Sequence, residues 1–108
     1  MTRVVVSGLG IVSPAGCDVA TFWQSLLTAT PKFAEASTLP GRGIRVAEVQ
    51  DADFAADLPL SSAHCDRNAL FAVAAARQAL AAAGFGNGFR LPERVGVVIG
   101  NAAGGQCT

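Results

Sequence analysis

Near the two ends of the chain, the hydrophobic positions form short uninterrupted runs. Val4 to Val6 are three β-branched residues in a row, and Val95 to Ile99 contain only apolar residues and one glycine. A strand covered on both faces needs such a continuous apolar pattern. We therefore predict two buried strands. The first ends at Gly8 and Gly10, because glycine accepts positive φ or a close approach of another backbone without steric cost.

A helical spacing begins at Asp18, whose side chain can cap a first turn by accepting backbone N–H bonds. Apolar residues then recur three and four positions apart in one stripe, and Pro31 ends the pattern. The stripe consists of Val19, Phe22, Trp23, Leu26 and Leu27. An aromatic residue at this spacing is typical of a packed interior. We therefore predict that Trp23 anchors a core and is no ligand platform.

Alanine, the best helix former, dominates the segment from Asp66 to Ala83. Gly84 stands where a left-handed residue can terminate the helix. Because small side chains occur on every side, we predict that neighbouring elements cover most faces of this helix. Arg77 and Gln78 mark its expected solvent edge. Most of its apolar volume comes from Leu70, Phe71, Val73 and Leu80.

The remaining segments predict one more strand and several turns. Ile44 to Val49 alternates imperfectly between apolar and charged residues, which is typical of a short strand near a sheet edge. Glycine and proline predict turns in Ser37–Gly43 and Phe85–Phe89. Asp51–Ser62 is irregular, with one helical turn expected around Phe54–Asp57. The predicted order is β-α-β-α-β, which implies parallel strands joined by right-handed crossovers.

The composition indicates part of a compact domain, with 51% hydrophobic and 15% charged residues. The apolar excess favours faces that meet partners. The formal net charge is zero and Lys32 is the one lysine, which argues against nucleic-acid binding. No apolar run has the length of a membrane span or the pattern of a signal peptide. Three widely spaced cysteines and one histidine predict free thiols in a reducing cytoplasm, without a metal site or cofactor.

Gly8-x-Gly10 invites comparison with a dinucleotide-binding turn, which would make the chain a nucleotide-binding α/β domain. Such a turn runs directly into a helix whose first amides face the phosphate. Pro14 and Gly16 stand where that helix would form, and both disfavour a helix interior. A nucleotide-binding domain is therefore kept as an alternative. Saturable binding of a dinucleotide to the protein would favour it.

Three blocks of the sequence resemble the N-terminal part of β-ketoacyl synthases, the condensing enzymes of fatty-acid and polyketide synthesis. RVVVSGLGIVSPAG, from Arg3 to Gly16, is similar to the family's opening strand and turn. Asp66-Arg67 with Ala69–Gly84 resembles its first long helix, and Arg94–Gly105 resembles the next buried strand and glycine loop. The blocks have the family's order and spacing and span nearly all of the 108 residues.

The resemblance implies an α/β, thiolase-like fold, of which this chain would supply the N-terminal β-α-β-α-β portion of a mixed five-stranded sheet covered by helices. Family members are much longer, with a nucleophilic cysteine and two catalytic histidines at positions beyond Thr108. Residues 1–108 are therefore expected to be a partial N-terminal domain, truncated before the catalytic cysteine. Such a segment holds no catalytic residue and is expected to be inactive alone.

For the full-length protein, the resemblance implies an acyltransferase. A cysteine takes an acyl group from acyl carrier protein, malonyl carrier protein is decarboxylated, and the carbanion attacks the acyl thioester without a metal or redox cofactor. The implied partners are acyl carrier protein, the acyl and malonyl thioesters, and a second subunit in a homodimer or heterodimer. Polyketide systems also contain a homologous non-catalytic subunit that determines chain length. That alternative is open, because it shares these opening blocks.

The predicted functional segment is the glycine-rich loop after Ile99, which matches the loop that borders the acyl pocket in the family. Its site residues are Ala102, Ala103, Gly104 and Gly105. The family commonly has a bulky isoleucine before the final glycine pair, where this sequence has Ala103. The missing volume leaves room for a longer or stiffer acyl chain, unless another side chain fills it.

The histidine and the cysteines do not form a convincing nucleophile. His64 and Cys65 are neighbours in sequence, which point apart in most local geometries, and no acid is placed to orient the imidazole. Cys107 follows the glycine loop and Cys17 follows Gly16, whereas the family's nucleophile lies on a later strand-to-helix turn. We interpret all three thiols as non-catalytic.

Overall fold

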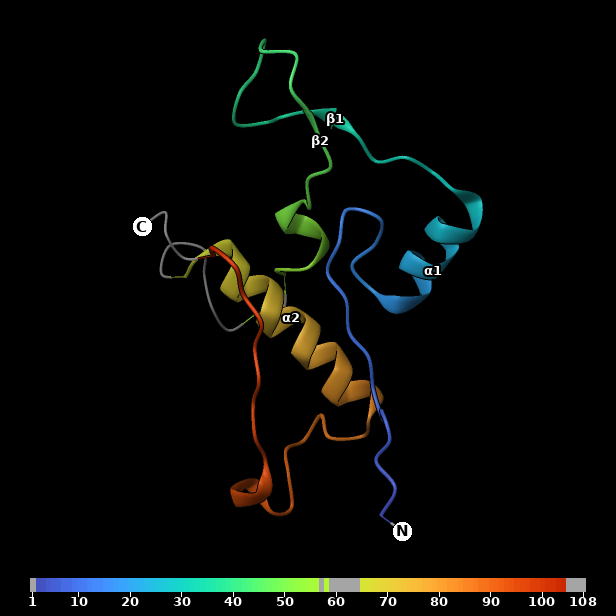
Figure 1. The fold of residues 1–108 in the computed structure, drawn as a ribbon, viewed down its shortest axis with the longest axis vertical. Helices are drawn as coiled ribbons and strands as arrows, with labels where there is room; N and C mark the ends of the chain where they lie inside the picture. The colour runs from blue at the N-terminus through green and yellow to red at the C-terminus, as the bar shows by residue number, and fades with distance from the viewer. Residues whose placement is uncertain (1, 57, 59–64, 105–108) are drawn as a thin grey trace.

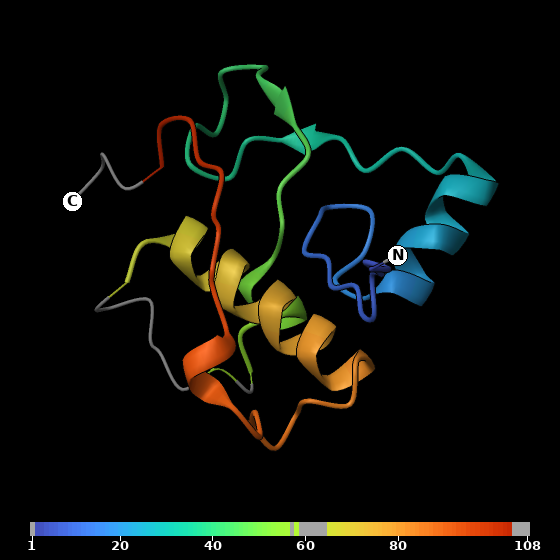
Figure 2. The same cartoon turned by 60° about the horizontal axis from the view of Figure 1, so that its bottom comes forward.

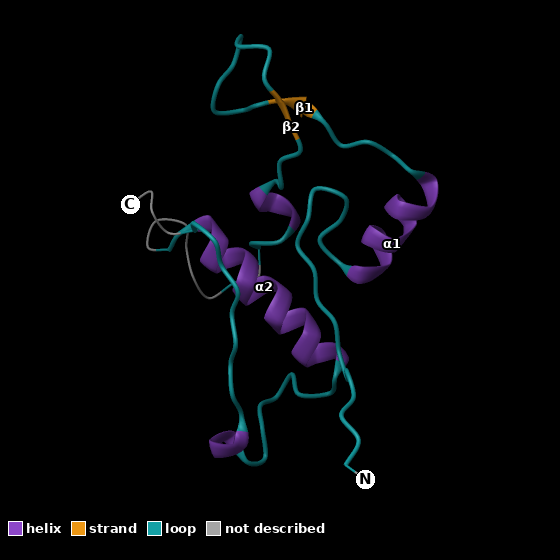
Figure 3. Cartoon of the chain, viewed as in Figure 1, coloured by secondary structure: helices purple, strands orange, loops and turns teal. Residues whose placement is uncertain are grey.

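The computed structural model describes residues 2–56, 58 and 65–104. Two α-helices, two very short strands and two 3₁₀ turns follow one another along the chain. They are α1 (Val19–Thr28), β1 (Ala34–Glu35), β2 (Arg45–Val46), η1 (Asp51–Asp53), α2 (Arg67–Ala82) and η2 (Pro92–Arg94). Helix α2 crosses the centre of the molecule, between the N-terminal segment and the segment that follows η2 (Figure 1). Most of the remaining chain is loop (Figure 3).

Both helices form where the sequence predicts them, because their signals are local. The Asp18 side chain caps α1, accepting hydrogen bonds from the Thr21 backbone N–H at 2.8 Å and from the Thr21 hydroxyl at 2.7 Å. Helix α2 ends at Ala82, and Gly84 adopts a left-handed φ of 83° just beyond it. The capping residue and the terminating glycine are thus confirmed.

The two predicted buried strands are absent from the structure, which corrects the sequence prediction. Neither Val4–Val6 nor Val95–Ile99 has strand pairing, and both are exposed: Val4 is 94% and Val98 is 98% accessible. A strand exists only through hydrogen bonds to a neighbouring strand. None of the described residues pairs with either segment. The apolar residues of both segments suit a strand, but no described strand lies beside either segment to pair with it.

The strand pair that the described residues do form is antiparallel, with Ala34 opposite Val46 and Glu35 opposite Arg45. β2 lies inside the predicted strand Ile44–Val49 but is shorter, and β1 was not predicted. The parallel β-α-β-α-β order is therefore wrong for this part of the chain. The turn-rich connector between the two strands reverses the chain direction, as a hairpin requires, with φ of 75° at Gly41 and 67° at Gly43.

The other turn predictions have mixed outcomes. In the predicted turn Phe85–Phe89, the Gly88 N–H donates to the Phe85 carbonyl at 2.9 Å, which confirms it. The helical turn expected around Phe54–Asp57 lies earlier, at Asp51–Asp53 in η1, and Asp57 lies outside the described residues. Asp51 and Asp53 occupy the first turn of η1. A carboxylate is favourable there because the N-terminus of a helix carries a partial positive charge.

The apolar core is small. Among the described residues, the buried hydrophobic side chains are Ala36, Leu70 and Ala74. Helix α2 has two buried residues and is otherwise half-buried or exposed, so the cover predicted for most of its faces is partial. Trp23 is 57% exposed, so its predicted role as a core anchor is wrong in this structure. The apolar stripe of α1 is present, but most of it stays exposed, including Val19, Leu26 and Leu27.

The N-terminal segment packs closely against α2 through its two glycines. A methyl group at Gly8 would collide with the carbonyl oxygen of Ala79 and lie 2.9 Å from the Ala83 nitrogen. At Gly10 it would collide with the carbonyl group of Ala75. Glycine and alanine together allow the two backbones to touch. The predicted close approach at these glycines is confirmed.

Gln78 holds the loop that follows these glycines. Its Oε1 accepts a hydrogen bond from the Ile11 N–H at 3.1 Å, and its Nε2 donates to the Cys17 carbonyl at 2.6 Å. The side chain is half-buried beneath the loop. Gln78 therefore does not mark a solvent edge, as its polarity suggested, but joins α2 to both ends of the loop from Ile11 to Cys17.

Candidate functional site

The predicted acyl-pocket loop lies beside the first turns of α2. A hollow of about 340 Å³ separates them, lined by Asn68, Ala69, Ala72, Ile99, Gly100 and Asn101. Three of these residues come from α2 and three from the segment after η2, which runs past the helix (Figures 1 and 2). The structure thus brings the second and third sequence blocks together around one open space.

A short turn closed by Asn101 and Gly104 shapes the loop. The Gly104 N–H donates to Asn101 Oδ1 at 3.0 Å, and Asn101 Nδ2 donates to the Gly104 carbonyl at 3.4 Å. Ala102 and Ala103 form the exposed tip between them. Any side chain at Gly104 would collide with Asn68 Nδ2 and come within 2.8 Å of the Asn101 amide. Gly104 thus lets the Asn68 side chain of α2 lie directly against the loop.

The lining of the hollow differs from the predicted site residues. Ala102, Ala103 and Gly104 lie in the loop, but they are not among the residues that line the hollow, and Gly105 lies outside the described residues. The border with an acyl chain therefore stays a prediction. Sequence reasoning missed Asn68 and Asn101. The signal for Asn68 was a weak helix former placed inside an alanine-rich helix.

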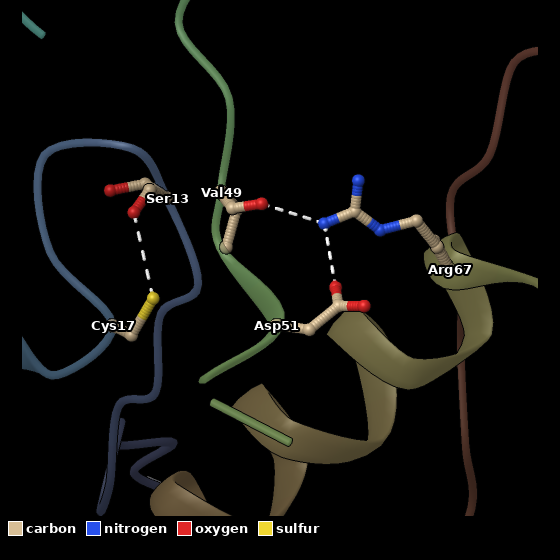
Figure 4. A network of polar contacts seen from close by, with 5 residues as sticks. All are labelled: Ser13, Cys17, Val49, Asp51 and Arg67. Carbon is tan, nitrogen blue, oxygen red and sulfur yellow. Dashed lines mark hydrogen bonds and ion pairs between the residues drawn. The ribbon is translucent and has the colours of Figure 1, made fainter. Parts of the chain in front are cut away.

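Cys17 is a half-buried thiol on the N-terminal loop. Its Sγ donates a weak hydrogen bond to the Ser13 carbonyl at 3.6 Å (Figure 4). Burial raises the pKa of the Cys17 thiol, and the carboxylates of Asp53 and Asp18 act in the same direction. A protonated thiol is a weak nucleophile, which agrees with a non-catalytic role. His64 and Cys107, the other candidates from the sequence, lie outside the described residues.

Arg67 ties the start of α2 to η1. Its Nη2 donates to Asp51 Oδ1 at 2.8 Å and to the Val49 carbonyl at 2.6 Å (Figure 4). The guanidinium also lies 5.3 Å from the ring centre of Phe71, which packs edge-on against Phe54. Arg67 and Asp51 are each about half exposed, so solvent weakens their ion pair. These contacts stabilise the position of α2 at the surface, and the cluster contains no nucleophile.

Nothing in residues 2–56, 58 and 65–104 resembles a metal centre, since no three histidine, cysteine or carboxylate side chains cluster there. The same residues contain no helix of the length and apolar character that a membrane crossing demands.

The family model of the β-ketoacyl synthase N-terminal domain matches residues 1–108. The chain therefore belongs to the β-ketoacyl synthase family. It is 39% identical over 110 residues to 3-oxoacyl-[acyl-carrier-protein] synthase 2 of Coxiella burnetii, covering 96% of this chain and 26% of that protein. It is 36% identical to the tetracenomycin polyketide synthase ketoacyl synthase alpha subunit of Streptomyces glaucescens, with 98% and 25% covered. No solved structure matches the chain.

Family membership confirms the resemblance and implies a thiolase-like α/β fold. The two helices and two-stranded sheet described here are consistent with part of such a fold. The chain spans about a quarter of the length of the two relatives. The nucleotide-binding alternative loses its support, because no described helix begins between Gly10 and Val19 to receive a phosphate.

Proposed function

We propose that residues 1–108 are the N-terminal part of a β-ketoacyl-(acyl carrier protein) synthase, an acyltransferase that performs decarboxylative Claisen condensation in fatty-acid or polyketide synthesis. The observation that carries the proposal is the family match over the whole chain. The names of its relatives cover both a 3-oxoacyl synthase and a polyketide ketoacyl synthase. The nucleophilic cysteine and the histidines lie in the remainder of the protein, so this segment acts as scaffold and pocket wall.

Two exposed apolar segments support the scaffold role. Val4–Val6 and Val95–Ile99 become strands of the family's mixed five-stranded sheet when neighbouring strands are present, because both have the pattern of a strand with two covered faces. The glycine contacts with α2 and the Gln78 hydrogen bonds then hold the first of these strands in place.

The partners follow from the same chemistry. Acyl carrier protein delivers the acyl and malonyl thioesters, and a homologous subunit completes a homodimer or heterodimer. The thiols of Cys17 and Cys65 are free, which suits a reducing cytoplasm. The loop from Gly100 to Gly104, beside the hollow on α2, borders the acyl chain.

The direct test is a chimera in which residues 1–108 replace the matching segment of the Coxiella burnetii relative. We expect it to form β-ketoacyl product from acyl and malonyl carrier protein, measured by mass spectrometry. The same chimera with its nucleophilic cysteine replaced by alanine is the matched control and should form none. A chimera that folds cooperatively but forms no product would contradict the proposed function, and saturable dinucleotide binding would revive the alternative.

A further inference from the structure

We propose that Asn68 determines the acyl-chain specificity of the hollow and selects chains that carry a keto oxygen. This inference rests on the proposed function, because it assigns a substrate class to the hollow between α2 and the loop from Gly100 to Gly104. Asn68 lies in the first turn of α2, and its Nδ2 atom occupies the place that a side chain on Gly104 would need. It is therefore in direct contact with the loop.

The two asparagines of the hollow use their side-chain amides differently. Both polar groups of Asn101 are hydrogen-bonded to Gly104, at 3.0 and 3.4 Å. Asn68 Oδ1 accepts from the Ala69 N–H at 2.9 Å, whereas Asn68 Nδ2 donates no hydrogen bond to any residue that the structure describes. Asn68, which lines the hollow, thus has an N–H donor without a partner among the described residues, whereas both polar groups of Asn101 are engaged.

The rest of the wall is apolar or backbone, from Ala69, Ala72, Ile99 and Gly100. A saturated acyl chain placed in this hollow would displace water from the Asn68 donor without replacing its hydrogen bond, which is unfavourable. A chain with a carbonyl oxygen at that depth would accept the bond. A site built around a hydrogen bond discriminates more strongly than an apolar wall that only measures length. The geometry therefore favours oxygenated chains.

The test uses the chimera described above and two acyl carrier protein thioesters of equal chain length, one saturated and one bearing a keto group. The ratio of their kcat/KM values reports the preference. Asn68→Leu removes the donor at similar volume, Asn68→Asp leaves only acceptors, and Asn87→Leu, in the exposed turn after α2, is the matched control. We expect the parent and Asn87→Leu to prefer the keto chain about tenfold, and both Asn68 variants to lose that preference.

The outcomes separate this inference from the proposed function. An unchanged ratio in Asn68→Leu, with both substrates turned over, would overturn the role of Asn68, as would a parent without preference. A chimera that condenses neither substrate contradicts the proposed function instead, and calorimetric binding of the two thioesters then measures the preference directly. If Asn68→Leu fails to fold, Asn68→Ser provides a smaller substitution whose own weak donor should retain part of the preference.

Discussion

The first turn of α1 depends on one carboxylate. The Thr21 backbone N–H, and then the Thr21 hydroxyl, lower the pKa of Asp18. A folded-state pKa below the unfolded value adds stability above the unfolded value of about 3.9, and that stability is lost as the pH falls through the folded pKa. Hydrogen exchange at the Thr21 amide should therefore be slow near neutral pH and accelerate, relative to the intrinsic rate, below about pH 4.

Two variants in the completed synthase distinguish the cap from general acid unfolding. Asp18→Asn keeps an accepting oxygen, so Thr21 protection should lose its pH dependence but remain. Asp18→Ala should reduce protection at every pH. Equal protection in Asp18→Ala and the parent would contradict the role of this cap.

Gln78 is the second single residue with a testable role. Gln78→Leu removes both hydrogen bonds to the N-terminal loop, each worth about 1 kcal/mol. In a chimera with Cys17 as its only cysteine outside the active site, we expect alkylation of Cys17 by a maleimide to accelerate severalfold. Gln78→Glu should be intermediate, because it keeps the acceptor for Ile11 but loses the donor to the Cys17 carbonyl. Gln24→Leu, at an exposed glutamine of α1, is the control. If Gln78→Leu leaves the alkylation rate of Cys17 unchanged, the Gln78 hydrogen bonds do not hold the loop.

At the scale of elements, the sequence predicted the helices, because their formation depends on residues that are close together along the chain. Asp18, the alanines of α2 and Gly84 specify helix starts and ends within a few residues, and both helices form accordingly. Strands depend on partners far along the chain, so the apolar run Val4–Val6 could not reveal that its partner is missing. The two-residue strand Ala34–Glu35 gave no signal in the sequence, because only its hairpin partner makes it a strand.

The same limit applies to the candidate site, whose border with an acyl chain stays a prediction. The glycine loop was found from its block, but the contact of Asn68 with Gly104 joins residues far apart in sequence, which no local pattern records. Gln78 was placed on the wrong side for the same reason. Its polarity suggested solvent, whereas it satisfies two backbone groups of the loop.

The loop from Gly100 to Gly104 carries a prediction about chain length. Ala103 is exposed in this structure and is expected to face the acyl chain in the completed enzyme. Ala103→Ile adds apolar volume without a polar group, so the chimera should fold normally and accept shorter acyl chains. Chain-length profiles from mass spectrometry measure this, with Asn87→Leu, in the exposed turn after α2, as the control. A folded variant with an unchanged profile would show that Ala103 does not border the chain.

At the scale of the whole molecule, residues 1–108 alone should be chemically inert toward acyl thioesters. Among the described residues, none places a base at hydrogen-bonding distance from Cys17 or Cys65, and burial raises the pKa of Cys17. Incubation with acyl carrier protein thioester, followed by intact-mass measurement, should detect no acylation above that of a free thiol. Faster acylation of any of the three cysteines would contradict this expectation.

The surface of the molecule shows that its apolar elements lack cover. The accessible surface is 8571 Å², whereas a compact monomer of this size exposes about 5,600 Å². The radius of gyration is 16.4 Å, against about 13 Å for a compact domain of this length. The excess includes the stripe of α1 and both valine-rich segments. Our central claim is that the rest of a β-ketoacyl synthase covers these surfaces.

Calorimetry combined with light scattering tests this claim most directly. Residues 1–108 alone should associate or remain loosely packed, with helical signal but no sharp thermal transition, because unpaired backbone and apolar surface stay exposed. The chimera should be monodisperse and unfold cooperatively. A monodisperse monomer of residues 1–108 with a sharp cooperative transition would contradict the claim.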